Sequence, residues 1–352
     1  MNLERRIKAF TKLGDFIAEI VNSYDENGNQ NSVENEFVNE FRNQIKLASE
    51  KNAWFTKTNI LFNLKSWSEQ LTEEKIREWG ANYNIEEVVQ KTVAIVMAGN
   101  IPLVGFHDFI SVLLSGHRVL VKQSSNDKNL LPYLAQYLKQ IEPEFKDLIE
   151  FTESKLENFD AVIATGSNNT ARYFEYYFRG KPSIIRKNRN SVAILSGKES
   201  EEDLGNLSED IFRYYGLGCR NVSKIYVPKN YNFDAFFNGI YHWKDLVNEH
   251  KYANNYDYNK AVYLMSEFDI LDNGFFMIKE DQSLGSPIAT LFYEYYSDEA
   301  DLQEKINSNR DNIQCIVANG LMAEEINFGE TQNPSLNDYA DNVDTIEFLS
   351  NL

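Results

Sequence analysis

Cysteine and histidine are scarce in this sequence. Only two cysteines, Cys219 and Cys315, occur among 352 residues. Two cysteines cannot form a disulfide framework or a multi-cysteine metal site. None of the four histidines has another histidine, a cysteine or a carboxylate at a spacing typical of metal ligands. They are His107, His117, His242 and His250. We therefore expect neither a disulfide scaffold nor a bound metal.

Long apolar runs and a surplus of basic charge are also missing. No apolar run approaches the length of about 20 residues that a membrane-spanning helix needs. The opening MNLERRIKAFTKLGDFIAEI has the spacing of an amphipathic helix and no signal-peptide core. The formal charge of −18 argues against sequence-independent nucleic-acid binding and against a polybasic anchor. We expect a cytoplasmic protein with no membrane anchor and no nucleic-acid partner, in which any anionic ligand is bound by locally gathered basic residues.

The hydrophobic pattern predicts an α/β protein. Residues 1–90 are typical of helices, and Thr72 is a candidate helix cap. Beyond them, the β-branched runs KTVAIVMAG, RVLVKQSS and FDAVIATGS alternate with helical segments, which predicts a parallel sheet with helical crossovers. We expect a helical region and a nucleotide-binding domain over 1–195, a second α/β domain over 196–325, and a return to the first domain over 326–352.

Three segments of the first domain have two interpretations each. The turn ATGSNN at 164–169 is either a plain helix cap or a cap that also binds a cofactor phosphate at the helix N-terminus. Lys122, at the end of a predicted strand, is either solvated or at the ligand-binding edge of the sheet. The basic stretch RGKPSIIRKNR at 179–189 either neutralises nearby carboxylates or binds an anion. No G-x-G-x-x-G fingerprint or P-loop is present.

The two cysteines lie in different settings. Cys315 lies in IQCIVAN, an apolar strand-like run, and is expected to be buried. Cys219 lies in YYGLGCRNVSKIYVP, after two glycines that allow a sharp turn and directly before a strand-like run. This position is suited to a nucleophile. A nucleophilic thiol needs stabilisation of its thiolate; Arg220 is a candidate for that role and is equally a candidate for a solvated loop residue.

These segments, in this order, resemble the aldehyde dehydrogenase superfamily, and in particular its LuxC-like acyl-CoA reductases, from about residue 90 to the C-terminus. AGNIP resembles the strand-to-turn segment whose asparagine serves the oxyanion hole, which implies that role for Asn100. GLGC followed by a strand resembles the nucleophile segment "G-Q-x-C", which implies that Cys219 is the catalytic thiol. The resemblance thus implies an aldehyde dehydrogenase-like fold and an acyl-cysteine intermediate.

The same resemblance implies a cofactor site in the first domain. SGHRVLVKQSS is similar to "A-G-N-x-V-V-x-K-P-S-E", which implies an adenosine-ribose contact for Lys122 and cofactor contacts for Ser124 and Ser125. ATGS is similar to the "F-T-G-S" turn before the cofactor helix, which implicates Gly166 and Ser167. Ser125 stands near the position of a glutamate that selects NAD, and a neutral hydroxyl there would not repel a 2′-phosphate. NADPH is the implied cofactor.

Two departures from the pattern bear on the reaction. Aldehyde-oxidising members carry a glutamate in "E-L-G-G-K" that activates water, whereas this region reads IRKNRNSV and has no carboxylate. An acyl thioester without a positioned base should resist water and persist for another acceptor. The glutamate of "E-x-F-G-P" falls near Ser283, although Glu280 and Asp281 are close in sequence.

The expected activity is therefore reduction of a long-chain acyl-CoA to the aldehyde by NADPH, through an acyl thioester on Cys219. One alternative is a CoA-acylating aldehyde dehydrogenase that acts on short aldehydes. A second is an acyl-carrying subunit of a fatty-acid reductase complex. The resemblance also implies a homo-oligomer and an acyl-activating partner enzyme. The aromatic segment FNGIYHW around His242 is either part of the hydrophobic core or the lining of an acyl channel.

Overall fold

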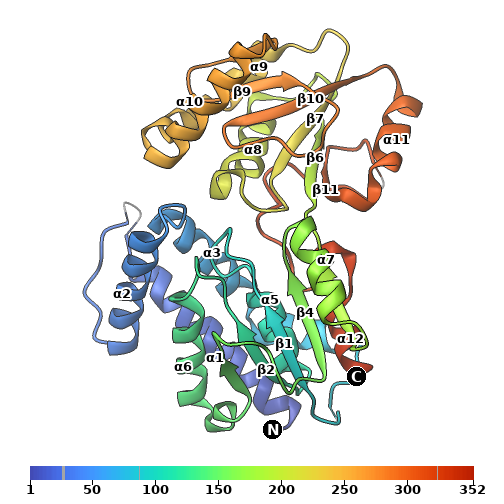
Figure 1. Ribbon diagram of the computed structural model, residues 1–352. Helices are drawn as coiled ribbons and strands as arrows, with labels where there is room; N and C mark the ends of the chain where they lie inside the picture. Colours follow the sequence, from blue (N-terminus) through green and yellow to red (C-terminus); the bar gives the residue numbers. More distant parts are fainter. Residues whose placement is uncertain (26–27, 87, 323) are drawn as a thin grey trace. The chain divides into compact units, whose positions relative to one another are not determined.

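The computed structural model describes residues 1–25, 28–86, 88–322 and 324–352 (Figure 1). The chain divides into two compact units. Unit 1 comprises Met1–Lys187 and Ser335–Leu352, and unit 2 comprises Asn188–Pro334. Each unit has its own sheet and its own hydrophobic core.

Unit 1 contains a five-stranded parallel sheet in the order β3-β2-β1-β4-β5. Its strands are β1 (Thr92–Val96), β2 (Arg118–Lys122), β3 (Ile149–Phe151), β4 (Ala161–Thr165) and β5 (Ser183–Arg186). The chain moves outward from β1 to β2 and β3, then returns to the other side of β1 with β4. Such a reversal is the place where open α/β sheets bind ligands, at the carboxyl ends of the strands.

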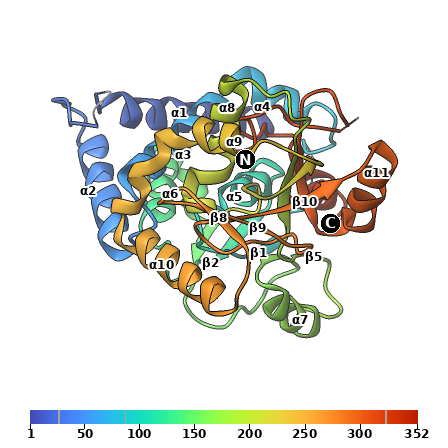
Figure 2. The same cartoon turned by 90° about the horizontal axis from the view of Figure 1, so that it is seen from above.

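Helices cover both faces of this sheet. They are α1 (Leu3–Asn22), α2 (Glu36–Lys51), α3 (Lys57–Gln70), α4 (Glu73–Gly80), α5 (Phe106–Leu114), α6 (Leu130–Ile141), α7 (Asn168–Tyr177) and α12 (Thr345–Ser350), with short 3-10 helices at Pro143–Lys146 and Ala340–Asn342. Val93 and Ile95 pack against the N-terminal helices, whereas Ala94 belongs to the cluster that includes Phe174 of α7. Figure 2 shows α7 on the side of the sheet opposite α1. The predicted burial of the strands on both faces is confirmed.

Unit 2 contains a six-stranded sheet in the order β11-β6-β7-β10-β9-β8, parallel except for the antiparallel edge strand β8. Its strands are β6 (Asn190–Ile194), β7 (Val222–Pro228), β8 (Ile270–Asp272), β9 (Met277–Glu280), β10 (Thr290–Tyr296) and β11 (Ile313–Val317). Its helices are α8 (Glu201–Phe212), α9 (Phe233–Gly239), α10 (His250–Met265) and α11 (Glu299–Ser308), with 3-10 turns at Arg213–Gly216, Tyr241–Asn248 and Arg310–Asn312. Helices α8 and α9 pack on one face and α11 on the other.

Three details of the fold differ from or refine the sequence-based expectations. The predicted range 1–195 for the first domain includes residues 190–194, but these form β6, which pairs with β7 and β11 and belongs to unit 2. The short edge strand β3 was not expected, because three residues carry no clear periodicity. In the aromatic segment FNGIYHW, Ile240 is fully buried and Phe237 and Trp243 pack partly buried against the core of unit 2, whereas Tyr241 and His242 are exposed.

Candidate functional site

Cys219 lies on an exposed turn at the entrance to β7. The chain reaches it through three consecutive residues in the left-handed region: Tyr214 (φ 55°), Tyr215 (φ 59°) and Gly216 (φ 75°). Non-glycine residues in this conformation cost roughly 1–3 kcal/mol each and persist only where the surroundings impose it. Both tyrosines are buried, so their rings hold the sharp bend that precedes the thiol.

A buried asparagine fixes the turn from inside. The side-chain amide of Asn221 donates to the carbonyl oxygens of Asp210 (3.0 Å) and Arg213 (2.8 Å) at the end of α8. Its Oδ1 accepts the N–H of Gly218 (2.8 Å), the residue before Cys219. One side chain thus satisfies the open carbonyl groups at a helix C-terminus and ties them to the cysteine turn.

A buried serine holds the turn from the sheet side. The Ser191 hydroxyl donates to the carbonyl of Cys219 (2.9 Å) and accepts the N–H of Cys315 in β11 (3.1 Å). The register of β6 against β7 shifts between Ser191 and Val192. At this irregularity the serine side chain supplies hydrogen bonds that a regular strand ladder would otherwise make.

A buried carboxylate connects the same turn to the segment 327–332. Asp210, on α8, accepts the N–H of Gly329 (2.6 Å) and both the N–H (3.0 Å) and the hydroxyl (2.7 Å) of Thr331. Arg220, beside Cys219, donates through Nε to the carbonyl of Thr331 (2.6 Å). Burial raises the pKa of Asp210 to about 6, although these hydrogen bonds oppose the rise. Because Asp210 is fully buried and accepts three hydrogen bonds, it is suited to positioning rather than to activating water.

In unit 1, the loop after β1 carries Asn100, whose side chain is exposed. At Gly99, a Cβ atom would lie only 2.5 Å from the Oγ of Ser124 in the loop after β2. Farther along, the N–H of Leu103, which has φ of 54°, donates to Oδ2 of Asp127 (2.9 Å). Burial raises the pKa of Asp127 to about 6. The two loops are therefore joined by the Ser124 side chain, which packs on Gly99 where only glycine leaves room, and by one buried carboxylate.

The turn after β4 has the features of an anion-binding helix start. Ser167 caps α7 and accepts the N–H of Thr170 (3.2 Å). A Cβ atom at Gly166 would lie 2.9 Å from Cγ2 of Thr170, so the backbone there is closely packed on the first turn of the helix. The exposed N-terminus of a ten-residue helix offers N–H groups and a favourable dipole to a phosphate.

The remaining residues of the predicted cofactor site lie at the same carboxyl edge of the sheet. Lys122, at the end of β2, donates to the carbonyl of Ser154 (3.1 Å). Ser124 accepts the N–H of Asn126 (3.2 Å), and Ser125 is exposed beside it. All the predicted cofactor residues and Asn100 are thus in unit 1, whereas Cys219 belongs to unit 2.

The basic stretch at 179–189 is largely committed to the fold. Arg186 is buried and pairs with Asp108 at 2.5 Å. Lys181 donates to the carbonyl of Phe159, and Lys187 pairs with Glu175 on α7. The ion pairs of Arg186 and Lys187 favour the interpretation in which the stretch neutralises nearby carboxylates over the one in which it binds an anion.

The carboxylates near Ser283 are also committed locally. Asp281 accepts Nζ of Lys279 (2.6 Å) and the N–H of Ser283 (2.9 Å). Burial alone would raise the pKa of Asp281, but these bonds lower it to about 2.

Across the residues that the structure describes, no group of three or more His, Cys, Asp or Glu side chains is arranged to hold a metal ion. Nor does any described helix have the length and apolar character needed to cross a membrane.

Sequence reasoning missed the buried polar residues that hold the cysteine turn. Asp210 stands in EEDLGNLSED, a helix crowded with carboxylates, and nothing in that pattern distinguishes the buried one. Ser191 and Thr331 lie far from Cys219 in sequence, so only the fold brings them to it. Asn221 had a weak signal, as an amide directly before an apolar strand.

Comparison with known proteins places this geometry in context. A family model described as acyl-CoA reductase (LuxC) matches residues 15–235, which include Asn100 and Cys219. No curated protein matches the sequence significantly.

Similar solved structures include an NAD-dependent aldehyde dehydrogenase from Sinorhizobium meliloti, with a TM-score of 0.63 at 13% identity, covering 94% of this chain and 72% of that one. The aldehyde dehydrogenase KauB from Pseudomonas aeruginosa gives a TM-score of 0.63 at 12% identity, covering 93% and 73%. Aldehyde dehydrogenase 21 from Physcomitrella patens gives 0.62 at 14% identity, covering 90% and 73%. The predicted aldehyde dehydrogenase-like fold is confirmed.

Proposed function

Because the chain belongs to the LuxC acyl-CoA reductase family, we propose that it reduces the thioester of an acyl-CoA to the aldehyde, with NADPH as the reductant and Cys219 as the nucleophile. The observation that supports this most is the setting of Cys219. The thiol-bearing residue is exposed on a bent turn, and buried Asn221, Ser191 and Asp210 hold that turn in place. Such support is typical of a nucleophile that must be presented in one geometry.

In the proposed reaction, the Cys219 thiolate attacks the thioester carbonyl carbon of acyl-CoA. The Asn100 amide and the backbone N–H of Cys219 stabilise the oxyanion. Each such donor is typically worth about 3–4 kcal/mol. The bond from the carbonyl carbon to the CoA sulfur then breaks, CoA leaves as the thiolate, and the acyl group remains on Cys219.

When bound, NADPH would supply the hydride that reduces the acyl group on Cys219. The resulting thiohemiacetal collapses, the bond to the Cys219 sulfur breaks, and the aldehyde leaves as the thiolate is restored. Acyl-CoA, NADPH and one proton are converted to aldehyde, CoA and NADP⁺. Gly166 and Ser167 at the start of α7 would hold the cofactor pyrophosphate, and Lys122, Ser124 and Ser125 its adenosine end.

The segment IRKNRNSV at 185–192 supports reduction over hydrolysis. It contains no carboxylate, and the buried Asp210 is occupied by three hydrogen bonds. An acyl-enzyme without a base to activate water persists long enough to be reduced or to return its acyl group to CoA.

The test is product analysis with purified protein. Acyl-CoA substrates from acetyl to palmitoyl are incubated with NADPH or NADH, and the aldehyde is trapped as a hydrazone. We expect one aldehyde per NADPH consumed, a preference for long acyl chains, and no aldehyde from Cys219→Ala. If the protein oxidises acetaldehyde in the presence of CoA and NAD as fast as it reduces long-chain acyl-CoA, the short-chain alternative is favoured. Formation of no aldehyde from any acyl-CoA would overturn the proposal.

A further inference from the structure

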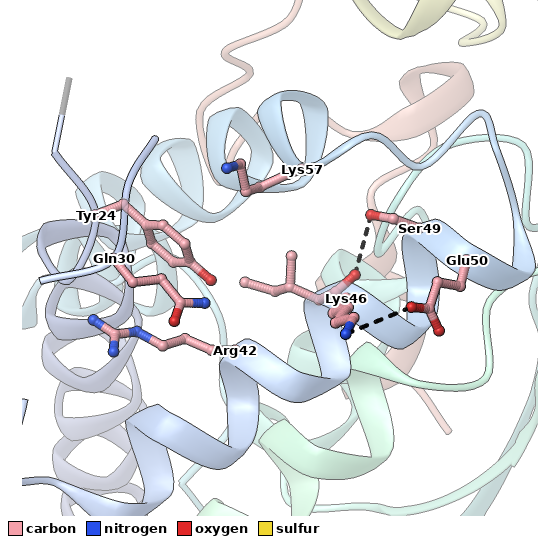
Figure 3. Close-up of a pocket in the computed structure, with 8 residues that line it drawn as sticks. Tyr24, Gln30, Arg42, Lys46, Ser49, Glu50 and Lys57 are labelled. Atoms are coloured by element: carbon pink, nitrogen blue, oxygen red, sulfur yellow. Dashed lines mark hydrogen bonds and ion pairs between the residues drawn. The ribbon is translucent and has the colours of Figure 1, made fainter. Parts of the chain in front are cut away.

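A cavity lined by several basic side chains lies among the N-terminal helices of unit 1. Its volume is about 460 Å³, within the range of small-molecule sites. It opens between the segment that follows α1, the helix α2 and the start of α3 (Figure 3). Its lining residues are Tyr24, Gln30, Arg42, Ile45, Lys46, Ser49, Glu50 and Lys57.

Among the described residues, three cations and one carboxylate line this cavity, although the chain as a whole carries a formal charge of −18. Arg42 is buried, and its guanidinium donates to Oγ of Ser23 (3.0 Å) and to the carbonyls of Ser23 (2.5 Å) and Asn31 (2.7 Å). These partners are neutral, so they fix the position of the charge without cancelling it. A fixed cation at a cavity wall raises the local potential against the field of the whole chain.

Lys57 has the same character at the opposite wall. It is the first residue of α3, after the cap Thr56, and its Nζ donates to the neutral carbonyl of Gly28 (2.6 Å). The positive end of the helix dipole adds to its charge. The third cation, Lys46, is exposed and only loosely paired with Glu50 at 3.9 Å. An exposed lysine of this kind can turn toward a ligand at small cost.

Tyr24 lies between the two fixed cations. The Arg42 guanidinium carbon is 5.4 Å and the Lys57 Nζ 5.8 Å from the centre of its ring. The electron-rich face of the ring attracts each of these charges and helps to keep both cations at the cavity wall.

The connection between α2 and α3 also touches the predicted cofactor edge. Asn52 donates to the carbonyl of Asn126 (3.5 Å), in the loop after β2 that carries Ser124 and Ser125. The cavity is thus in the same unit as the residues assigned to the adenosine end of the cofactor. The connection between two of the helices that line it also contacts the loop that carries Ser124 and Ser125.

We propose that this cavity binds a phosphate monoester carried on an adenosine ribose. The inference rests on the proposed function, because both co-substrates of that reaction carry such a group: NADPH at the ribose 2′ position and CoA at the 3′ position. A dianionic phosphate is the ligand that two fixed cations and one mobile lysine recognise best.

The test compares a double variant with a matched control. Lys46→Ala/Lys57→Ala removes two lining charges and leaves the structural Arg42 in place. Lys51→Ala/Lys65→Ala removes two exposed lysines from the same helices, neither of which lines the cavity. Both variants are checked by thermal unfolding. If the double variant fails to fold, the single variant Lys57→Gln is used instead.

Binding is measured by calorimetry with three probes: adenosine 2′,5′-bisphosphate, adenosine 3′,5′-bisphosphate and adenosine 5′-monophosphate. We expect one bisphosphate to bind the wild type about tenfold more tightly than the monophosphate, and the double variant to lose that advantage. The control variant should bind within about twofold of the wild type. Equal binding of all three probes, or equal losses in both variants, would overturn the proposal.

Kinetics then identify the source of the phosphate. A 3′-phosphate site predicts that the double variant raises KM for acyl-CoA but not for the matching acyl-pantetheine. A 2′-phosphate site predicts a raised KM for NADPH but not for NADH. Calorimetry requires no turnover, so the binding site and the reaction are tested separately. Bisphosphate binding that depends on the two lysines, without aldehyde formation, would support the site and reject the proposed reaction. Aldehyde formation with equal bisphosphate binding by the wild type and the double variant would support the reaction and reject the site.

Discussion

Asp127 and Asp210 are two buried carboxylates that hold loops next to the proposed catalytic residues, one in each unit. Burial raises the pKa of each to about 6. Asp210 accepts three hydrogen bonds from Gly329 and Thr331. Asp127 accepts one, from Leu103, and its Oδ1 has no hydrogen-bond partner among the residues that the structure describes.

The two carboxylates have similarly raised pKa values but differ in the number of hydrogen bonds that they accept. In unit 2 the three donors around Asp210 offset part of the desolvation of the carboxylate, and the same hydrogen bonds hold the segment 327–332 to the cysteine turn. In unit 1 the loop that carries Asn100 needs only the acceptor that Asp127 gives to Leu103. We therefore expect the same substitution to have opposite effects at the two sites.

The largest expected effect is on catalysis at the unit 1 loop. Asn100→Ala removes one proposed oxyanion donor and should lower kcat by about 10²–10³-fold, since an interaction made in the transition state is lost. The free energy of unfolding should stay within about 0.5 kcal/mol, because the side chain is exposed. Asn126→Ala, a nearby exposed asparagine, is the control. A kcat for Asn100→Ala close to the control would remove Asn100 from the mechanism.

The next effect is at the cysteine turn. Asp210→Asn replaces one accepting oxygen with an amide that faces an N–H or O–H donor, which should lower the free energy of unfolding by about 3 kcal/mol. Misplacement of the turn should also lower kcat at least about tenfold while KM for NADPH stays constant. Stopped-flow single turnovers and urea unfolding measure the two quantities. A destabilised variant with full kcat would show that Asp210 stabilises the fold without positioning Cys219.

A smaller effect tests the close approach of the two loops in unit 1. Gly99→Ala places a Cβ atom 2.5 Å from Oγ of Ser124 and should cost about 2 kcal/mol of stability. Ser124→Gly in the same chain should recover most of that loss, since the clashing atoms are removed. As a control, Gly205→Ala in α8, which meets nothing within 4 Å, should stabilise the protein by up to about 1 kcal/mol. Additive losses in the double variant would argue against the contact.

The smallest effect has the opposite sign. Asp127→Asn keeps an acceptor for the N–H of Leu103 and removes a poorly satisfied buried charge, so it should raise the free energy of unfolding by about 1 kcal/mol at pH 8. The folded pKa is raised from 3.8 to about 6, so the folded state binds its proton more tightly than the unfolded state. The stabilisation that protonated Asp127 contributes to the wild type is therefore lost as pH rises from about 4 to 6, and the advantage of the variant should appear over that window. An advantage that is independent of pH would contradict this account.

Much of the fold could be predicted from the sequence. Short β-branched runs marked β1, β2 and β4, because strands buried on both faces carry continuous apolar residues, and a glycine follows β1 and β4. Thr72 marked the start of α4, where its side chain accepts the N–H of Lys75. The boundary between the units was harder, since β6 is an apolar strand like those before it and only its pairing assigns it to unit 2.

The turn position of Cys219 and the burial of Cys315 also followed from their neighbours in sequence, and both are confirmed. The buried residues that support the exposed turn, Ser191, Asn221 and Asp210, could not be recognised from their neighbours in sequence. The left-handed backbone at Tyr214 and Tyr215 contradicts the preference of both residues and is imposed by tertiary packing. Burial of one aspartate in an acidic helix depends on what the fold places over it.

The most direct test of the central claim is intact mass after incubation with palmitoyl-CoA, followed by addition of NADPH. The wild type and Cys315→Ala should each gain a single palmitoyl group, and Cys219→Ala should gain none. NADPH should then discharge the adduct as hexadecanal. An adduct that NADPH leaves in place would indicate an acyl carrier, and acylation of Cys219→Ala equal to that of the wild type would contradict the assignment of the nucleophile.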